Sequence, residues 1–243
     1  MKTAIVIGAT SGIGLEVARL LAQRGYKVGV AGRREQQLVQ LVNTTEGIVA
    51  YRQIDVNDSS ASDKLHDLIN ELGGMNLYFH SSGIGWENCQ LDIERELLTV
   101  QTNALGFTRM VAAAYQWFAT HTDGQGHIAC ITSIARTRGL GAAPAYSATK
   151  RFQSHYLECL AQQARMRHLN IHITDIRPGF VATPLIAGSH FPLQLSATAV
   201  AHSIVKAIEQ RRHTITIDWR YRLLVAAWSL IPRWIWIRLR GVK

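Results

Sequence analysis

Short apolar runs alternate along this chain with longer segments whose apolar residues recur at helical spacing, as far as about residue 217. The runs predict strands and the longer segments predict helices. This alternation is typical of an α/β fold with a doubly wound parallel sheet, right-handed crossovers and helices on both faces. The predicted strands are Thr3–Ile7, Val28–Ala31, Val49–Ile54, Leu77–His80, His127–Thr132, Ile171–Ile176 and Thr214–Ile217. The predicted helices are Gly12–Arg24, one after Arg34, Asn57–Leu72 with Asn57 or Asp58 as its cap, Leu97–Thr120, Ala145–Arg167 and Ala197–Gln210.

Residues suited to binding or chemistry follow the predicted strands. Ligands of such sheets bind beyond the carboxyl ends of the strands, where the strand order reverses. We therefore expect one site at this edge. The residues concerned are Gly8–Gly14, Arg33, Asp55, Gly83, Ser133 and Pro178.

The first of these segments, Gly8-Ala9-Thr10-Ser11-Gly12-Ile13-Gly14, follows a strand and opens a helix. Glycines let the backbone approach a pyrophosphate, and the helix N-terminus offers free N–H groups. The spacing is G-x-x-x-G-x-G, which differs from the usual dinucleotide fingerprint. The alternative is an ordinary strand-to-helix loop. The position of the segment Gly8–Gly14 on the first crossover favours a cofactor-binding loop.

Arg33 and Arg34 end the second predicted strand, where an NAD site usually carries an acid. An arginine there suits a 2′-phosphate, so we expect NADP(H); the alternative is that both arginines begin a solvated helix. Asp55 ends the third strand and is placed to contact adenine, or else it caps a turn.

Tyr146 and Lys150 are four residues apart, so they share one helix face. A nearby ammonium stabilises a phenolate and lowers the phenol pKa, which makes a usable general acid/base. Ser133 ends the fifth strand, thirteen residues before Tyr146, and is placed to donate to a substrate oxygen; turn formation is its alternative role. Asn103 is unfavourable within a helix, which favours a role in the site over simple exposure.

Taken together, these motifs resemble the short-chain dehydrogenase/reductase family over residues 1–217. The resemblance implies one Rossmann-type domain and an oxidoreductase acting on CH–OH or C=O groups of a small molecule. It implies a tetrad in which Tyr146 exchanges a proton with the substrate oxygen, Ser133 orients that oxygen, and Lys150 binds the nicotinamide ribose. Asn103 would hold a water that links Lys150 to solvent. The implied cofactor-binding residues are Gly8, Thr10, Ser11, Gly12, Ile13, Gly14, Arg33, Arg34, Asp55, Val56, Ser82, Gly83, Tyr146, Lys150, Pro178, Gly179, Val181 and Thr183.

Two positions depart from the family pattern. Ile7 stands where a Thr hydroxyl usually ties down the glycine loop. His80-Ser81-Ser82 stands before Gly83 in place of Asn-Asn-Ala. Because the tetrad is intact, we favour an NADP(H)-dependent carbonyl reductase or alcohol dehydrogenase. The alternative is a catalytically silent NADPH-binding or membrane-associated scaffold or sensor protein.

Most of the charge lies near the C-terminus. The net charge is +9, and residues 211–243 hold eight Lys/Arg against one Asp, so they contribute +7. Residues 218–243 are predicted to form a separate basic, Trp-rich amphipathic tail. Trp, aliphatic and Arg residues together suit contact with an anionic membrane surface, and packing against the body or a symmetry partner is the alternative. The nearly neutral body argues against nucleic acid as a partner.

A mostly apolar segment, Pro184–Leu195, is predicted to cover the substrate, with His190 as a candidate contact. It favours an apolar or lipid-like substrate. Three widely spaced cysteines show no metal or disulfide pattern and favour a reducing compartment. We expect a buried N-terminal strand and no secretory signal, and a cytoplasmic location, at the inner face of a membrane if the tail binds it. The resemblance implies a homo-oligomer, a dimer or tetramer.

Overall fold

A seven-stranded parallel sheet organises the chain in the computed structural model, which describes residues 2–122, 124–184 and 193–239. The strand order is β3-β2-β1-β4-β5-β6-β9, so the order reverses between β1 and β4, as in a doubly wound Rossmann sheet. A separate short pair joins β7 (Val181–Ala182) to β8 (Leu195–Ser196). The sheet strands are β1 (Thr3–Ile7), β2 (Lys27–Gly32), β3 (Ile48–Gln53), β4 (Leu77–His80), β5 (Gln125–Ile131), β6 (Asn170–Arg177) and β9 (Thr214–Thr216).

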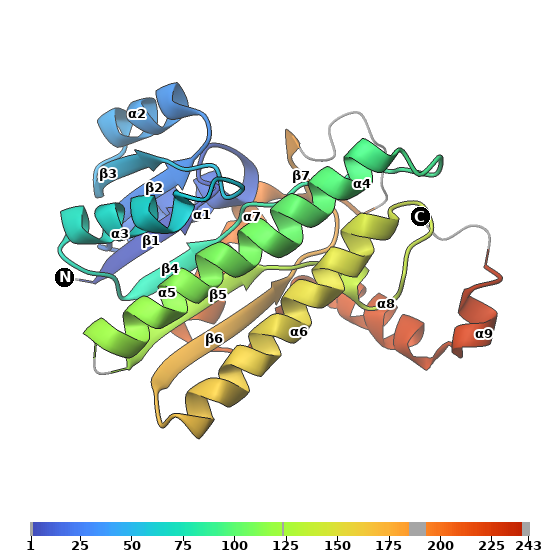
Figure 1. Cartoon of the computed structure of the whole chain (residues 1–243). Coiled ribbons are helices and arrows are strands. Elements are labelled where there is room, and N and C mark those ends of the chain that lie inside the picture. Colours follow the sequence, from blue (N-terminus) through green and yellow to red (C-terminus); the bar gives the residue numbers. More distant parts are fainter. Residues whose placement is uncertain (1, 123, 185–192, 240–243) are drawn as a thin grey trace.

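Helices cover both faces of this sheet (Figure 1). Successive side chains of a strand point to opposite faces, so Ile5 and Ile7 enter one core while Ala4 and Val6 enter the other. The first core is closed by α3 (Ala61–Leu72), α5 (Phe107–His121) and α6 (Pro144–Met166). The second is closed by α1 (Gly12–Gln23), α2 (Glu35–Thr44) and α7 (Ala197–Glu209).

Two predicted helix starts were wrong. The third helix begins at Ala61, after Ser60. Neither Asn57 nor Asp58 is its cap, because both lie in the turn before the helix. The Asn57 N–H donates to Asp55 Oδ1 at 3.0 Å, and the Asp58 carbonyl accepts the Ala61 N–H at 3.2 Å. The predicted helix Leu97–Thr120 starts earlier, as α4 (Ile93–Val100), because Asp92 caps it by accepting the N–H groups of Glu94 and Arg95.

A π-helical turn, η1 (Gln101–Gly106), joins α4 to α5. The sequence pattern predicted one unbroken helix here, since a single inserted residue hardly disturbs helical spacing. Such turns are rare and occur frequently at functional sites. This one contains Asn103.

The C-terminal segment forms two helices, α8 (Trp219–Leu230) and α9 (Arg233–Trp236), on the side of the molecule away from α2 and β3 (Figure 1). It packs against the body. Tyr221 is 1% exposed, and its hydroxyl accepts the N–H of Phe180 at 3.2 Å and donates to the Leu193 carbonyl at 3.1 Å. Within the described ranges, none of the helices has the length and apolar character needed to cross a bilayer.

Arg138 holds the end of α8. Its guanidinium donates to the carbonyl oxygens of Trp228, Ser229 and Ile231, and the indole N–H of Trp236 donates to the Gly139 carbonyl at 2.8 Å. These bonds satisfy carbonyl groups that the end of a helix leaves free. We call Arg138 together with the carbonyl groups of Trp228, Ser229 and Ile231 the Arg138 clamp.

Candidate active site

A cavity of about 640 Å³ lies at the carboxyl ends of the strands, across the point where the strand order reverses. It brings together residues that are far apart in the sequence. Two of the predicted site residues, Gly14 and Asn103, do not line it. The other predicted residues that line it are Gly8, Thr10, Ser11, Gly12, Ile13, Arg33, Arg34, Asp55, Val56, Ser82, Gly83, Ser133, Tyr146, Lys150, Pro178, Gly179, Val181 and Thr183.

The glycine loop between β1 and α1 forms one end of the cavity. Gly8 has φ +84°, and its N–H donates to the Ala31 carbonyl at 2.8 Å. A Cβ on Gly14 would lie 2.2 Å from the Gly8 carbonyl oxygen, so only glycine lets the loop close on α1. Gly14 therefore supports the loop from behind, which explains why it does not line the cavity.

Two arginines follow β2 at the rim of this end. The Arg34 guanidinium donates to Thr10 Oγ1 at 2.6 Å and Ser11 Oγ at 2.8 Å, so it is tied to the glycine loop. Arg33 is exposed and also lines the cavity. Asp55 lines it too, while one of its carboxylate oxygens closes the turn to Asn57. A backbone cradle beside two guanidinium groups fits a phosphorylated dinucleotide.

Ser133, Tyr146 and Lys150 meet near the middle of the cavity. Ser133 begins η2 (Ile134–Arg136), and its hydroxyl oxygen accepts the Ala135 N–H at 3.1 Å. The hydroxyl proton is thus available to donate into the cavity, where the Ser133 side chain also hydrogen-bonds Tyr146. Tyr146 lies in the first turn of α6, and Lys150 follows one turn later. The Lys150 Nζ is 5.7 Å from the centre of the Tyr146 ring.

The electrostatics of this pair differ from the expectation. Burial raises the pKa of Tyr146, and a hydrogen bond with Ser133 opposes the rise. Burial lowers the pKa of Lys150 to about 8, against the attraction of Cys130 and Asp175. The prediction that the pKa of Tyr146 lies below its ordinary value is therefore wrong for this arrangement, because burial outweighs the neighbouring charge. The ammonium itself donates to the Ile131 carbonyl at 3.1 Å and to Gln153 Oε1.

Asn103 lies behind the cavity and is fully buried. Its Oδ1 accepts the Ile84 N–H at 2.9 Å, and its Nδ2 donates to the Ile84 carbonyl at 2.7 Å. The side chain thus pins the loop that follows β4 and holds Gly83. Its backbone carbonyl accepts a hydrogen bond from Gln153 at 2.8 Å, where the resemblance implied a water.

His80 ends β4, at a position that departs from the family pattern. It is fully buried, its Nδ1 lies 2.8 Å from the Tyr78 hydroxyl, and its ring meets Phe107 edge to face. Burial, with a contribution from Lys150, lowers the pKa of His80 to about 3. His80 is therefore a neutral packing residue beneath the site. Ser82 and Gly83 still line the cavity.

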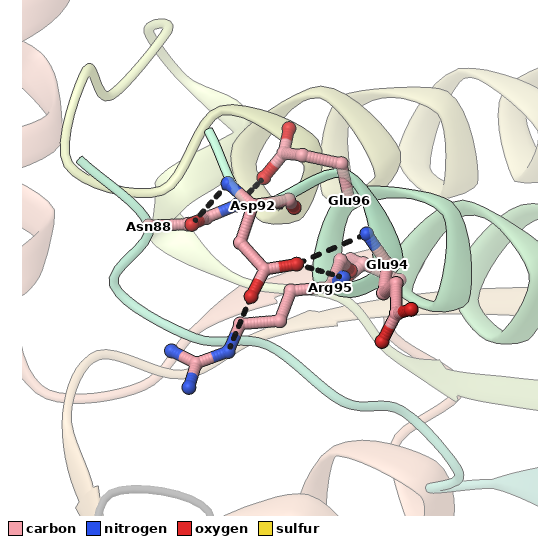
Figure 2. Close-up of polar contacts among 6 residues, drawn as sticks. Asn88, Asp92, Glu94, Arg95 and Glu96 are labelled. Atoms are coloured by element: carbon pink, nitrogen blue, oxygen red, sulfur yellow. Dashed lines mark hydrogen bonds and ion pairs between the residues drawn. The ribbon is translucent and has the colours of Figure 1, made fainter. Parts of the chain in front are cut away.

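A polar cluster joins the loop after β4 to α4 (Figure 2), and its member Glu96 extends it to the start of α6. Asn88 donates through Nδ2 to Glu96 Oε1 at 2.8 Å and accepts the Asp92 N–H at 2.9 Å. The other carboxylate oxygen of Glu96 accepts the N–H of Ala145 at 3.1 Å. The residue before Tyr146 is thus held by a side chain of α4.

Several residues of the site were missed by sequence reasoning. A Cβ on Gly85 would lie 2.3 Å from the Tyr146 ring, so this glycine lets the loop pass the ring. Trp86 and Leu140 line the cavity, as does Trp228, which the Arg138 clamp holds in place. No local spacing marks these residues. The predicted covering segment lies largely in residues 185–192, with His190, outside the described residues.

Comparison with known proteins agrees with this geometry. Residues 2–190 match the family model for short chain dehydrogenases. An uncharacterised oxidoreductase of Myxococcus xanthus is 33% identical over 198 residues, covering 79% of this chain and 77% of that protein. Among solved structures, a variant of actinorhodin polyketide ketoreductase with NADPH has a TM-score of 0.77 at 23% identity, covering 89% of this chain and 95% of that one. An alcohol dehydrogenase from Thermococcus sibiricus with 5-hydroxy-NADP has a TM-score of 0.78 at 20% identity, covering 91% of this chain and 97% of that one.

Proposed function

The chain belongs to the short-chain dehydrogenase family, and from that premise we propose that it is an NADP(H)-dependent carbonyl reductase or alcohol dehydrogenase. The observation that carries the proposal is the placement of Ser133, Tyr146 and Lys150 around one cavity with the glycine loop and Arg33. Two similar structures carry NADPH or an NADP analogue, which supports the same choice of cofactor. NADP(H), when bound, supplies or accepts the hydride.

In this proposal, the glycine loop and the ends of β2 and β3 hold the dinucleotide. Backbone N–H groups of Gly8–Gly14 and the N-terminus of α1 receive the pyrophosphate. Arg33 receives the 2′-phosphate, because its guanidinium is exposed at the rim while that of Arg34 is bound to Thr10 and Ser11. The segment after β6 receives the nicotinamide end. Its residues that line the cavity are Pro178, Gly179, Phe180, Val181 and Thr183.

The proton is exchanged at the Tyr146 hydroxyl. The raised pKa of Tyr146 keeps the phenol protonated at neutral pH, so it is ready to give a proton to a carbonyl oxygen. Ser133, which hydrogen-bonds Tyr146 in the structure, turns its hydroxyl proton to the same substrate oxygen and orients it. Lys150 contributes a buried positive charge next to the phenol, and this charge stabilises the phenolate once the proton has left.

We propose an apolar or lipid-like substrate. Large apolar side chains contribute to the cavity lining, among them Ile134, Leu140, Phe180 and Trp228, with Glu87 as an acid besides Asp55. The half-buried Trp228 ring packs against Trp236 at 5.3 Å between centres, so this wall is held rigidly. Such a wall favours an aromatic or aliphatic group next to the carbonyl over a charged one.

Residues 218–243 are proposed to have two roles. Their inner side completes the cavity through Trp228. Their outer side exposes large apolar side chains among arginines, which supports contact with an anionic membrane surface at the cytoplasmic side. The exposed residues are Trp219, Leu223, Leu230, Trp234 and Ile237.

We also propose that the chain forms a homo-oligomer. Large apolar side chains are exposed on α4, on η1 and on α6, and a patch of this kind on a folded domain marks an interaction surface. Burial against a second copy would remove them from water. The patch comprises Leu97, Leu98, Leu105 and Phe152.

Turnover distinguishes this enzyme from a silent NADPH-binding scaffold. Tyr146→Phe removes the proton donor and keeps the ring, so we expect NADPH binding, followed by fluorescence, to persist while reduction of apolar ketones falls by about 10²-fold or more. Wild-type protein that binds NADPH but reduces no member of a broad carbonyl panel would support the scaffold instead.

A further inference from the structure

Gln153 is a buried amide one turn after Lys150 on α6. Its Oε1 accepts from Lys150 Nζ at 2.9 Å, and its Nε2 donates to the backbone carbonyl of Asn103 at 2.8 Å. We propose that Gln153 is a positioning residue that holds the Lys150 ammonium and bridges it directly to Asn103, where the family resemblance implies a water. The proposal deepens the proposed function and rests on it for its catalytic meaning.

The orientation of this amide is chemically determined. The ammonium of Lys150 only donates and the Asn103 carbonyl only accepts. A flipped amide would place nitrogen against nitrogen and oxygen against oxygen, and both hydrogen bonds would be lost. Gln153 therefore has one arrangement, in which its length matches the gap between the two groups.

The partner of Gln153 is itself held firmly. Asn103 is fully buried within the π-helical turn, and its side chain is bonded to the backbone of Ile84 and to Thr149 Oγ1. Gln153 thus connects α6 to a rigid point of η1. The Ile131 carbonyl at the end of β5 holds the ammonium from another direction.

Gln153 supports the charge of Lys150 without adding a charge of its own. The other groups that face this ammonium are Tyr146 on α6, Cys130 on β5, Asp175 on β6 and His80 on β4. Burial favours the neutral amine, while a hydrogen bond to the charged form favours the ammonium. Within the described part of the chain, Gln153 and the Ile131 carbonyl are the acceptors of Lys150, so losing Gln153 removes one of the two.

The first test measures Lys150 itself, without turnover. The ¹³C resonance of the Lys150 side chain is followed against pH in protein labelled at lysine, and Lys150→Met identifies the signal. Gln153→Met keeps the chain length and removes the acceptor, so we expect the midpoint to fall by about one pH unit. Gln153→Glu places a carboxylate beside the ammonium and raises the midpoint. Gln162→Met, at an exposed position of the same helix, leaves it unchanged.

The second test is the pH profile of turnover with saturating NADPH. We expect the alkaline limb of kcat to move with the Lys150 midpoint, to lower pH in Gln153→Met and to higher pH in Gln153→Glu. If Gln153→Met does not fold, the Gln153→Glu variant decides both measurements alone. Midpoints that agree within about 0.3 pH unit in wild type and variants overturn the positioning role. Wild type without turnover refutes the proposed function, and the resonance measurement still decides the role of Gln153.

Discussion

Glu96 on α4 binds the backbone N–H of Ala145, so a side chain from another helix holds the start of the helix that carries Tyr146. The distance is 3.1 Å, and the same carboxylate accepts from Asn88 Nδ2 at 2.8 Å (Figure 2). The first N–H groups of a helix have no partner within it, and a negative charge is favourable there. This contact links the loop after β4 to the position of the reacting phenol.

Glu96→Ala should therefore lower both stability and turnover. Removing the carboxylate leaves the Ala145 N–H and the Asn88 side-chain amide without this hydrogen-bond acceptor. We therefore expect a loss of about 1–3 kcal/mol in the free energy of unfolding. A displaced Tyr146 should also lower kcat by about tenfold. Glu96→Gln keeps an acceptor and should lose less. Glu94→Ala, at an exposed acid in the same turn of α4, is the matched control. Equal kcat in Glu96→Ala and Glu94→Ala would contradict the link.

Exchange of Arg33 tests the choice of cofactor. Arg33→Ala removes the guanidinium proposed for the 2′-phosphate, so NADPH should bind about ten- to a hundredfold more weakly while NADH binding changes little. Arg34→Ala should weaken both cofactors, because Arg34 is bound to Thr10 and Ser11 of the glycine loop. Fluorescence titration of both nucleotides measures this difference. An unchanged ratio of the two affinities in Arg33→Ala would refute the assignment.

Local spacing explains what the sequence could predict. The glycine loop and the Tyr146/Lys150 pair are defined by residues close together in the chain, and the structure places both at the cavity. A parallel sheet with helices on both faces follows from the βα alternation and its right-handed crossovers. These features need no knowledge of distant contacts.

Distant contacts explain what the sequence could not predict. The partner of Gln153 lies 50 residues away, and that of Glu96 lies 49 residues away. The direction of the Tyr146 pKa was predicted wrongly because burial outweighs a neighbouring charge that donates elsewhere. The packing of α8 depends on Arg138, 90 residues before Trp228. The sequence of residues 218–243 by itself therefore did not indicate how this segment packs against the body.

His80 predicts a loss of stability in acid. In the folded protein its pKa is about 3, whereas an unfolded chain binds a proton below about 6.5. Between these values the unfolded state binds more protons, so stability falls as pH falls. At pH 5 the contribution of His80 should be about 2 kcal/mol below its value at pH 7 and above.

Urea unfolding of His80→Asn at both pH values measures this contribution. The variant should lose less stability than wild type between pH 7 and pH 5, even if it is less stable at both because packing against Phe107 is lost. His155→Asn, on the exposed side of α6, should follow wild type. Parallel losses in His80→Asn and wild type would show that His80 is not the group responsible.

The Arg138 clamp predicts a change in substrate selection. Arg138→Ala frees the end of α8 and with it Trp228, so KM for bulky apolar ketones should rise about tenfold while a small ketone is hardly affected. NADPH affinity should stay the same, because Arg138 bonds the end of α8 and does not line the cavity. Arg220→Ala, in α8 but paired with Asp218, is the control. An equal effect on small and bulky ketones would argue against a wall formed by α8.

The outer side of residues 218–243 predicts binding to vesicles that contain anionic lipids. Truncation before Asp218 would also remove Tyr221 and Trp228, so exchange of exposed residues is the sharper test. Serine at all of the exposed positions should abolish co-flotation with these vesicles while leaving ketone reduction intact, since none of these side chains lines the cavity. The positions are Trp219, Leu223, Leu230, Trp234 and Ile237.

A second set of serine exchanges separates membrane contact from self-association. The apolar patch of α4, η1 and α6 is proposed to face another copy of the chain, so its exchange should lower the mass measured by light scattering and leave co-flotation unchanged. The patch positions are Leu97, Leu98, Leu105 and Phe152. If wild type remains at the bottom of the gradient, the outer side of α8 does not bind membranes. If instead the tail exchanges lower the mass, those side chains pack against a second copy, because exposed apolar residues leave water by either route.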